Sequence, residues 1–147
     1  DEINLDTALW RIPAKRMKMD NPHNVPLSTQ AVAILEQMGR LHGKEGLVFP
    51  GRDGVKPLSE NTMLYALYRM GYHSRATVHG FRAAFSTIAN EADFDGDVIE
   101  KALAHEQRNK VRAAYHRSEY LEQRRELMQW WGNLLQEMEQ SASIAAA

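Results

Sequence analysis

The chain contains no cysteine among its 147 residues. Disulfides and thiolate zinc sites are therefore excluded, and this lack of thiols suits a reducing cytoplasm, where we expect the protein to act. No apolar run approaches the roughly 20 residues that a membrane-spanning helix needs, so we expect no membrane partner. An apolar fraction of 44% and a charged fraction of 25% are those of an ordinary soluble globular protein.

The chain also has little net charge. Its 18 basic and 19 acidic side chains leave a formal charge of −1, which argues weakly against nucleic acid as a partner. The charges are unevenly distributed, however. Basic side chains outnumber acidic ones in residues 101–125 and cluster again in residues 11–18, whereas residues 91–100 are acidic. One positive and one negative face are compatible with this pattern, so charge alone does not decide the partner.

Two short strands are expected, over residues 8–13 and 23–27. Turn residues occupy positions 20–22, between the two runs. We therefore expect a small antiparallel sheet with its hairpin tip near these positions. The run Leu47-Val48-Phe49 is a candidate for one more short strand.

Helices are predicted from apolar residues at helical spacing and from the capping residues before them. The expected starts are Ser28, Ser59, Thr77 or Val78, and Asp95 or Asp97, with Gly71 just past the end of the second helix. A short helix is expected over residues 108–115 and a long amphipathic one from about Ser118 to Glu139. The tail over residues 140–147 is expected to be frayed and disordered.

Three polar motifs occur in order along these expected helices. His79 and Arg82 are three residues apart and so share one helix face. His105 ends the sequence Leu-Ala-His, and Tyr115 follows it by ten residues. Arginine can grip a phosphate bidentately, histidine can transfer protons, and tyrosine can attack phosphorus once it is assisted, because its pKa is ~10. These are the side-chain types that cleavage of a phosphodiester requires.

In order and spacing the motifs resemble the C-terminal half of the catalytic domain of tyrosine recombinases, of the phage integrase kind. The matched residues are His79 and Arg82 for the family's His-x-x-Arg pair, His105 for its Leu-Gly-His element, Tyr115 for its nucleophile and Lys18 for its hairpin lysine. The run Arg-Ala-Ala-Tyr-His-Arg is similar to that of integrases of mobile genomic islands. The resemblance implies an α+β, mostly α-helical fold with a small antiparallel β-sheet at one edge, in which residues 1–147 form a single, partial catalytic domain.

The resemblance also implies a role for each matched residue. Tyr115 would attack the scissile phosphate and form a 3′-phosphotyrosine, while Arg82 and His105 would hold its non-bridging oxygens. Lys18 would protonate the leaving 5′ oxygen, and His79 would assist proton transfer. The implied function is site-specific recombination that integrates or excises a mobile element or prophage. The implied partners are double-stranded DNA attachment sites and, in the full-length protein, further copies in a tetramer, and no metal or other cofactor is implied.

Some assignments have rivals within the sequence. Tyr120 is a second candidate nucleophile, and Lys15 is a second candidate for the hairpin lysine. Five basic residues are candidates for phosphate contacts or simply a solvated face: Lys15, Arg16, Arg75, Arg108 and Arg112. The remaining histidines have no partners at metal-ligand spacing.

The apolar stripe of the last helix allows two interpretations. It carries Leu121, Met128, Trp131, Leu135 and Met138. Packing against its own domain is the default for such a stripe. Docking onto a neighbouring protomer is the alternative that the resemblance adds.

One element of the resemblance falls outside the sequence. The family's first catalytic arginine precedes a segment similar to residues 2–6, and no arginine of this chain matches it. We therefore expect an excised fragment that cleaves DNA very poorly alone. The competing hypothesis is a non-catalytic fragment that binds DNA or docks onto other protomers.

Overall fold

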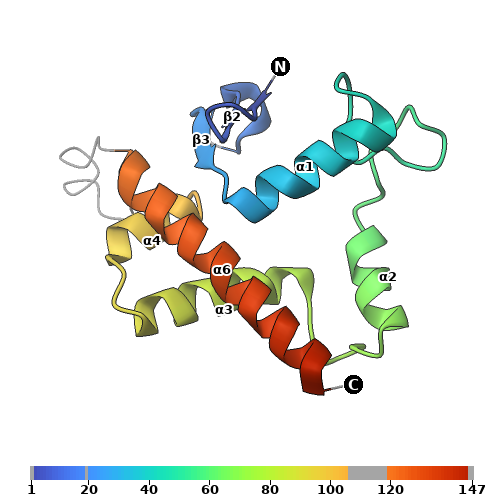
Figure 1. Ribbon diagram of the computed structural model, residues 1–147. Helices are drawn as coiled ribbons and strands as arrows, with labels where there is room; N and C mark the ends of the chain where they lie inside the picture. The colour runs from blue at the N-terminus through green and yellow to red at the C-terminus, as the bar shows by residue number, and fades with distance from the viewer. Residues whose placement is uncertain (1, 19, 106–118, 146–147) are drawn as a thin grey trace.

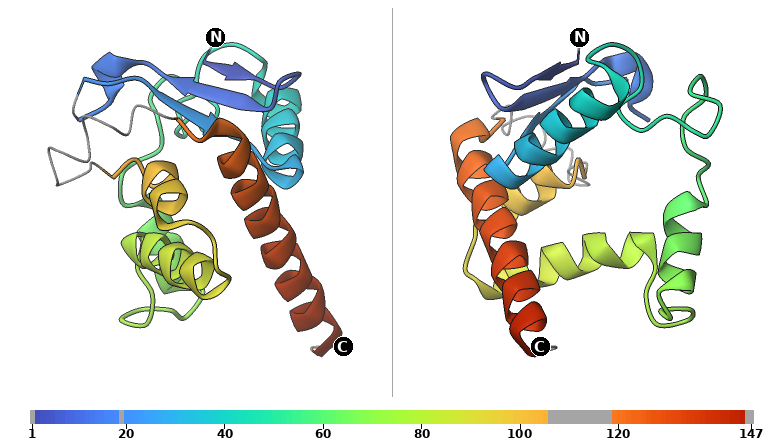
Figure 2. Two further views of the ribbon diagram at one scale, coloured as in Figure 1. Left: turned by 90° about the vertical axis from the view of Figure 1, so that its left-hand side faces the viewer. Right: turned by 45° about the vertical axis from the view of Figure 1, so that its right-hand side comes forward.

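The computed structural model describes residues 2–18, 20–105 and 119–145. The described chain is mostly helical with one small three-stranded antiparallel sheet, which confirms the expected fold class. Helix α6 (Leu121–Ala145) crosses α3 (Val78–Glu91) and α4 (Gly96–Ala102), and the sheet lies at one end of this arrangement (Figure 1; Figure 2). No helix within the described residues is long and apolar enough to cross a membrane.

The sheet has the strand order β1-β2-β3 and is antiparallel throughout. Its strands are β1 (Ile3–Asn4), β2 (Leu9–Ile12) and β3 (His23–Pro26). The two expected strands are confirmed as β2 and β3, and a 3-10 helix, η1 (Ala14–Arg16), lies in the connection between them. We did not expect β1, because a strand of two residues is too short to show the alternation that marks a strand.

The strand considered at Leu47-Val48-Phe49 is absent. In this region the structure contains only an isolated bridge between Pro50 and Pro57. Proline has no N–H to donate, so these positions cannot extend a ladder. Leu47 and Phe49 are exposed, so packing does not stabilise a strand at these residues.

Three of the expected helix starts are confirmed by their capping bonds. Ser28 Oγ accepts a hydrogen bond from Ala31 N at 3.2 Å, at the start of α1 (Thr29–His42). Thr77 caps α3 and Asp95 caps α4 in the same way. Each cap satisfies an N–H group that would have no partner within the helix.

The expected start at Ser59 is wrong. The residue before helix α2 (Thr62–Arg69) is Asn61, so the helix begins two residues later than a cap at Ser59 predicts. The Ser59 carbonyl accepts a hydrogen bond from Thr62 N at 2.9 Å, so these residues form a turn ahead of the helix. The hydroxyl of Ser59 accepts from Asn61 N, at 3.4 Å, within that turn.

Helix α4 ends in a Schellman motif that determines where His105 lies. Ala104 has a left-handed conformation, with φ of 53°. Its N–H donates to Lys101 O at 3.1 Å, and the His105 N–H donates to Glu100 O at 2.9 Å. These are the two bonds of that motif, which satisfy carbonyls of the last helical turn.

The same motif ends α2 and α3. Its left-handed residue is Gly71, with φ of 85°, after α2, and Asp93, with φ of 61°, after α3. Gly71 therefore lies just past the end of α2, as its sequence position predicted. Glycine has no Cβ to oppose this conformation, whereas alanine at position 104 adopts it at a steric cost.

The core lies where α6 packs on α3 and α4. Its buried residues are Phe85, Ala89, Val98, Ile99, Leu103 and Leu127. The Trp131 ring meets Phe85 edge-on at 5.2 Å between centroids, and the Trp130 ring lies 4.8 Å from that of Phe94. Such aromatic pairs contribute beyond the area that they bury. Helix α6 thus holds together α3, which carries Arg82, and α4, which precedes His105.

The stripe of α6 is divided between core and surface. Met128 and Trp131 pack against the core, which confirms the default interpretation for this half of the helix. Leu135 and Met138 are 47% and 58% exposed. The helix also continues to Ala145, past the expected end at Glu139, because its last turns are rich in strong helix formers. Residues 140–145 of the expected frayed tail are therefore helical.

Helix α6 also approaches the start of α1 closely, at Gly132. A Cβ atom at this buried glycine would lie 2.8 Å from Ser28 Oγ and 2.9 Å from Ser28 Cβ. The amide side chain of Gln129 accepts a hydrogen bond from Thr29 N at 2.9 Å beside it. The absence of a side chain at position 132 therefore lets α6 pass over the cap of α1.

A buried arginine joins α6 to the sheet. Arg124 is 1% exposed, and its Nη2 donates to the carbonyl of Asn24 in β3. Its Nη1 donates to Glu119 O at 3.3 Å, while Nη2 also lies 3.4 Å from His23 Nε2. A guanidinium can only donate, so Nε2 must accept and the His23 ring is neutral. Burial, and after it the charge of Arg124, lowers the pKa of His23 to about 4.

The neutral state of His23 predicts a loss of stability in acid. Above its ordinary pKa of about 6.5, His23 is neutral in the folded and unfolded chain. As the pH falls from there toward 4, the unfolded chain binds a proton that the folded chain excludes. We expect His23 to lower the free energy of unfolding by roughly 2 kcal/mol between pH 7 and pH 5.

Urea unfolding at both pH values, for the wild type and His23→Gln, measures this difference. His42→Gln, at an exposed histidine of α1, serves as the control and should keep the wild-type pH dependence. Equal pH dependence in the wild type and His23→Gln would contradict the prediction.

The left-handed residue before His105 predicts an unusual response to glycine. Ala104→Gly removes a steric cost of about 1–2 kcal/mol and adds about 0.5–1 kcal/mol of chain entropy, so we expect a net stabilisation of up to about 1 kcal/mol. The matched control is Ala102→Gly, in the last turn of α4, which should destabilise by about 1 kcal/mol. Urea midpoints compare the two, and equal losses of stability would count against the assigned conformation.

Candidate active site

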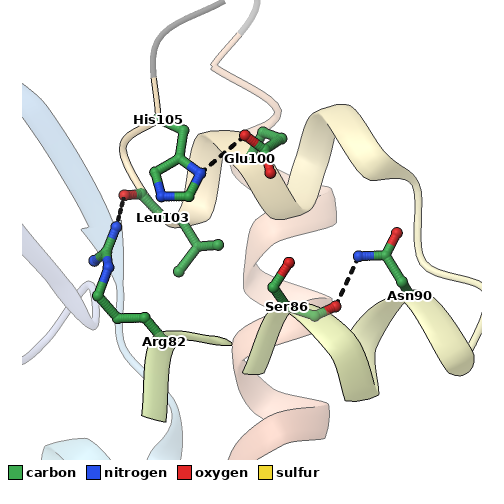
Figure 3. A network of polar contacts seen from close by, with 6 residues as sticks. All are labelled: Arg82, Ser86, Asn90, Glu100, Leu103 and His105. Atoms are coloured by element: carbon green, nitrogen blue, oxygen red, sulfur yellow. Dashed lines mark hydrogen bonds and ion pairs between the residues drawn. The ribbon is translucent and has the colours of Figure 1, made fainter. Parts of the chain in front are cut away.

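Arg82 extends from α3 to the end of α4. Its Nη2 donates a hydrogen bond of 2.6 Å to the carbonyl oxygen of Leu103 (Figure 3). Leu103 caps α4, where carbonyls lack partners within the helix and carry partial negative charge. The guanidinium is thus bound by a backbone group of the Leu-Ala-His element itself. This bond uses one of the five N–H groups of Arg82.

His105 is held against the same helix from the other side. Its Nδ1 lies 2.9 Å from Glu100 Oε2, and each of these two side chains is 46% exposed. An ionised carboxylate can only accept, so Nδ1 carries the proton in this contact. Figure 3 shows the second ring nitrogen turned away from Glu100, toward the side on which Arg82 lies. The structure therefore brings together Arg82 and His105, two of the predicted catalytic residues.

His79 lies one turn before Arg82 on α3. Thr77 caps this helix through Gly80 N, which places His79 in its first turn. Both His79 and Arg82 are exposed. Helical spacing puts them on one face, so α3 presents both side chains to the same region.

The expected hairpin lysine lies in the connection between β2 and β3. Lys18 follows η1 and is exposed, as is Lys15 within η1. Across residues 2–18, 20–105 and 119–145, no hydrogen bond or ion pair joins Lys18 to Arg82 or His105. The structure thus leaves both lysines exposed on this connection without favouring one.

Arg16 differs from its basic neighbours because it is already paired. Its Nη1 lies 2.5 Å from Glu2 Oε2, which also accepts a hydrogen bond from Trp10 Nε1 at 3.2 Å. The Trp10 bond and the Arg16 bond lower the pKa of Glu2. This triad braces the connection against β1 and β2.

Arg75 lies in the turn that precedes α3. Its guanidinium sits 5.8 Å from the centre of the Tyr72 ring. It borders a surface pocket of about 410 Å³ that Gly80, Phe81 and Ala84 also line. Successive helical residues are rotated by about 100°, so these positions face away from Arg82. The expected phosphate contact of Arg75 would therefore be made apart from the Arg82 region.

Tyr115, Arg108 and Arg112 lie outside the described residues. The rival tyrosine is described: Tyr120 is partly buried and packs against the hydrophobic core. It has a φ of 46° and immediately precedes α6. A packed tyrosine at a helix start has a structural role, which favours Tyr115 as the candidate nucleophile.

Sequence reasoning missed the two groups that hold the predicted residues. It included Glu100 only in the acidic stretch of residues 91–100, and it had no means of placing the Leu103 carbonyl. The spacing of five residues between Glu100 and His105 is the available signal, because it is the span of the longer Schellman bond. Within the described part of the chain, no cluster of three His, Asp or Glu residues could hold a metal ion.

Comparison with known proteins gives a consistent result. The model of the phage integrase family matches residues 1–122. The chain is 49% identical over 136 residues to the prophage integrase IntA of Escherichia coli (strain K12), covering 92% of this chain and 33% of that protein. It is 45% identical over 152 residues to the integrase of Enterobacteria phage P4, covering 92% of this chain and 35% of that protein.

A third relative, the integrase of Shigella phage Sf6, is 38% identical over 137 residues, which cover 92% of this chain and 36% of that protein. The chain thus spans about a third of the length of these relatives. No solved structure matches it. On the family match and the identity to these integrases, the chain belongs to the phage integrase family.

Proposed function

We propose that this chain is the part of a site-specific recombinase that breaks and rejoins DNA through Tyr115. Membership of the integrase family supports recombination of phage or prophage DNA in general terms. The tyrosine mechanism and the individual residue roles are our own inference. Because the chain spans about a third of its relatives, the proposal concerns this segment within a longer protein.

The observation that carries the proposal is the junction of Arg82 and His105 at the end of α4. Arg82 binds the Leu103 carbonyl, and His105 is held two residues further along the chain. A cationic fork and an imidazole are thereby held near each other, and both remain exposed. This suits a phosphate in which charge develops on the non-bridging oxygens, because donors oriented in advance need no reorganisation during the reaction.

The proposed reaction is a transfer of the phosphoryl group from DNA to tyrosine. The Tyr115 hydroxyl oxygen forms a bond to phosphorus, and the bond from phosphorus to the 5′ oxygen breaks. His79 accepts the tyrosine proton, while Lys18 gives a proton to the departing 5′ oxygen. The phosphodiester is exchanged for a phosphotyrosine ester, so attack by another 5′ hydroxyl reverses the step without an external energy source.

Double-stranded DNA attachment sites are the proposed substrates, and a tetramer on DNA is the proposed assembly. Recombination exchanges strands between two duplexes, which requires more than one tyrosine. The exposed end of α6, with Leu135 and Met138, is a surface that such an assembly could cover. The integration or excision of a mobile element would follow from the pairing of two sites.

Tyr115→Phe tests the proposed nucleophile. The protein, extended to the length of its relatives, is mixed with a nicked attachment-site DNA that traps the covalent intermediate. We expect a covalent protein–DNA band from the wild type and none from Tyr115→Phe, because phenylalanine has no attacking oxygen. Arg82→Ala should lower the rate of band formation by roughly 10²–10³ by removing charge stabilisation.

Tyr120→Phe is the matched control and should form the band at the wild-type rate. Mobility-shift assays should show the same DNA affinity for all three tyrosine forms. A band that persists in Tyr115→Phe would refute the assignment. A folded wild type that binds DNA and forms no band would favour the non-catalytic module instead.

A further inference from the structure

Glu100 contacts His105 twice, through its backbone and through its side chain. Its carbonyl oxygen accepts the His105 N–H at 2.9 Å within the Schellman motif. Its Oε2 lies 2.9 Å from Nδ1 of the same histidine. The first bond sets where the backbone of His105 leaves α4, and the second sets how its ring is turned. Glu100 thus determines both the backbone position and the ring orientation of His105.

The side-chain contact also selects the tautomer of His105. A neutral imidazole carries its proton on one nitrogen only, and the neighbour of the ring determines which one. Glu100 is an acceptor, so it requires the proton on Nδ1. This leaves Nε2 as the atom that faces away from α4, on the side of Arg82 in Figure 3.

We propose that Glu100 is a positioning residue for His105. By accepting a hydrogen bond from Nδ1–H it holds the ring in one orientation, with Nε2 turned toward the DNA phosphate. A non-bridging oxygen only accepts, so the ring donates to it after taking up a second proton on Nε2. This inference rests on the proposed function, in which His105 contacts that phosphate. Glu100 itself does not touch the reacting atoms.

Arg82 and Glu100 therefore act on the same helix end from two sides. Arg82 binds the carbonyl of Leu103, and Glu100 binds the residue two positions later. The Leu103 side chain is buried in the core, so the backbone between these contacts is anchored. A displacement of about 1 Å in a reacting group can cost about 10²-fold in rate, which is the reason such anchoring matters.

Removal of the carboxylate tests the proposal directly. In the protein extended to the length of its relatives, we expect Glu100→Ala to slow covalent band formation on nicked DNA by about 10-fold to 100-fold. DNA affinity should stay within about twofold of the wild type, because the hydrogen bond acts on orientation and not on binding. Glu100→Gln keeps an oxygen that accepts from Nδ1, so it should restore most of the rate.

A purely structural role for Glu100 would not give this pattern of rescue. Glu36→Ala, at an exposed position in the middle of α1, is the matched control and should keep the wild-type rate. Wild-type activity in Glu100→Ala would overturn the proposal. Equal losses in Glu100→Ala and Glu100→Gln would overturn it too.

A second readout does not depend on activity. Nitrogen NMR of the histidine rings reports which nitrogen of His105 carries the proton. In the DNA-free protein with a neutral ring, we expect the Nδ1–H form in the wild type and in Glu100→Gln, and a shift toward the Nε2–H form in Glu100→Ala. The same ring spectrum in the wild type and Glu100→Ala would overturn the proposal.

His105→Ala separates this inference from the proposed function. If His105→Ala cleaves at the wild-type rate, the catalytic role of His105 fails. If His105→Ala is slow while Glu100→Ala is not, the recombinase proposal stands and the positioning role fails.

Discussion

The buried guanidinium of Arg124 is the constraint on which the arrangement of α6 and the sheet depends. Placing a charge in a protein interior is costly unless its donors find acceptors. Nη1 and Nη2 of Arg124 meet that requirement with the carbonyls of Asn24 and Glu119 and with the ring of His23, whereas Nε is buried without an acceptor among the described residues. Glu119 in turn accepts from the Asn24 side chain at 2.8 Å. The start of α6 is therefore bound to β3, and through β3 to the connection that carries Lys18. Removal of the His23 ring would take away one acceptor of this buried charge, whereas the Asn24 carbonyl is present whatever side chain position 24 carries.

From this anchor, α6 extends over the core and determines how α3 and α4 meet. Phe85 of α3 and Ile99 of α4 are both buried against it. Side-chain packing in such a core is dense and transmits small displacements, so the relative positions of Arg82 and His105 depend on apolar contacts that neither residue makes. Because Gly132 has no side chain, the same helix also passes close to the cap of α1. One helix thus contacts the sheet, α1, α3 and α4.

Helix starts could be predicted from the sequence where they depend on contacts between neighbouring residues. Thr77, with Val78 as its alternative, and Asp95, with Asp97 as its alternative, could be predicted as helix starts because a side-chain oxygen beside a free N–H needs no distant partner. The same rule gave a wrong prediction at Ser59. The residues after Ser59 form a turn ahead of α2, and the capping pattern does not exclude such a turn. The pairing of Arg124 with β3 spans about a hundred residues of sequence, and no pattern of spacing reports it. The two catalytic candidates could be named from the sequence, but the contacts that join them could not, because one of the acceptors is a backbone carbonyl.

Because the acceptor of the Arg82 bond is the Leu103 carbonyl, this contact depends on the backbone at the end of α4. A carbonyl at position 103 is present whatever side chain the residue carries, so the Arg82 contact is sensitive to the path of the backbone and not to the chemistry of Leu103. The path is set by the left-handed turn at Ala104 and by the two bonds of the Schellman motif. The carbonyl is also the negative end of α4, which attracts the guanidinium and would repel a phosphate. In the proposed reaction, Arg82 and His105 would stand between this helix end and the phosphate. The bond from Arg82 offsets the negative end of α4, and in the proposed reaction the orientation of both groups before DNA binds would remove an ordering cost.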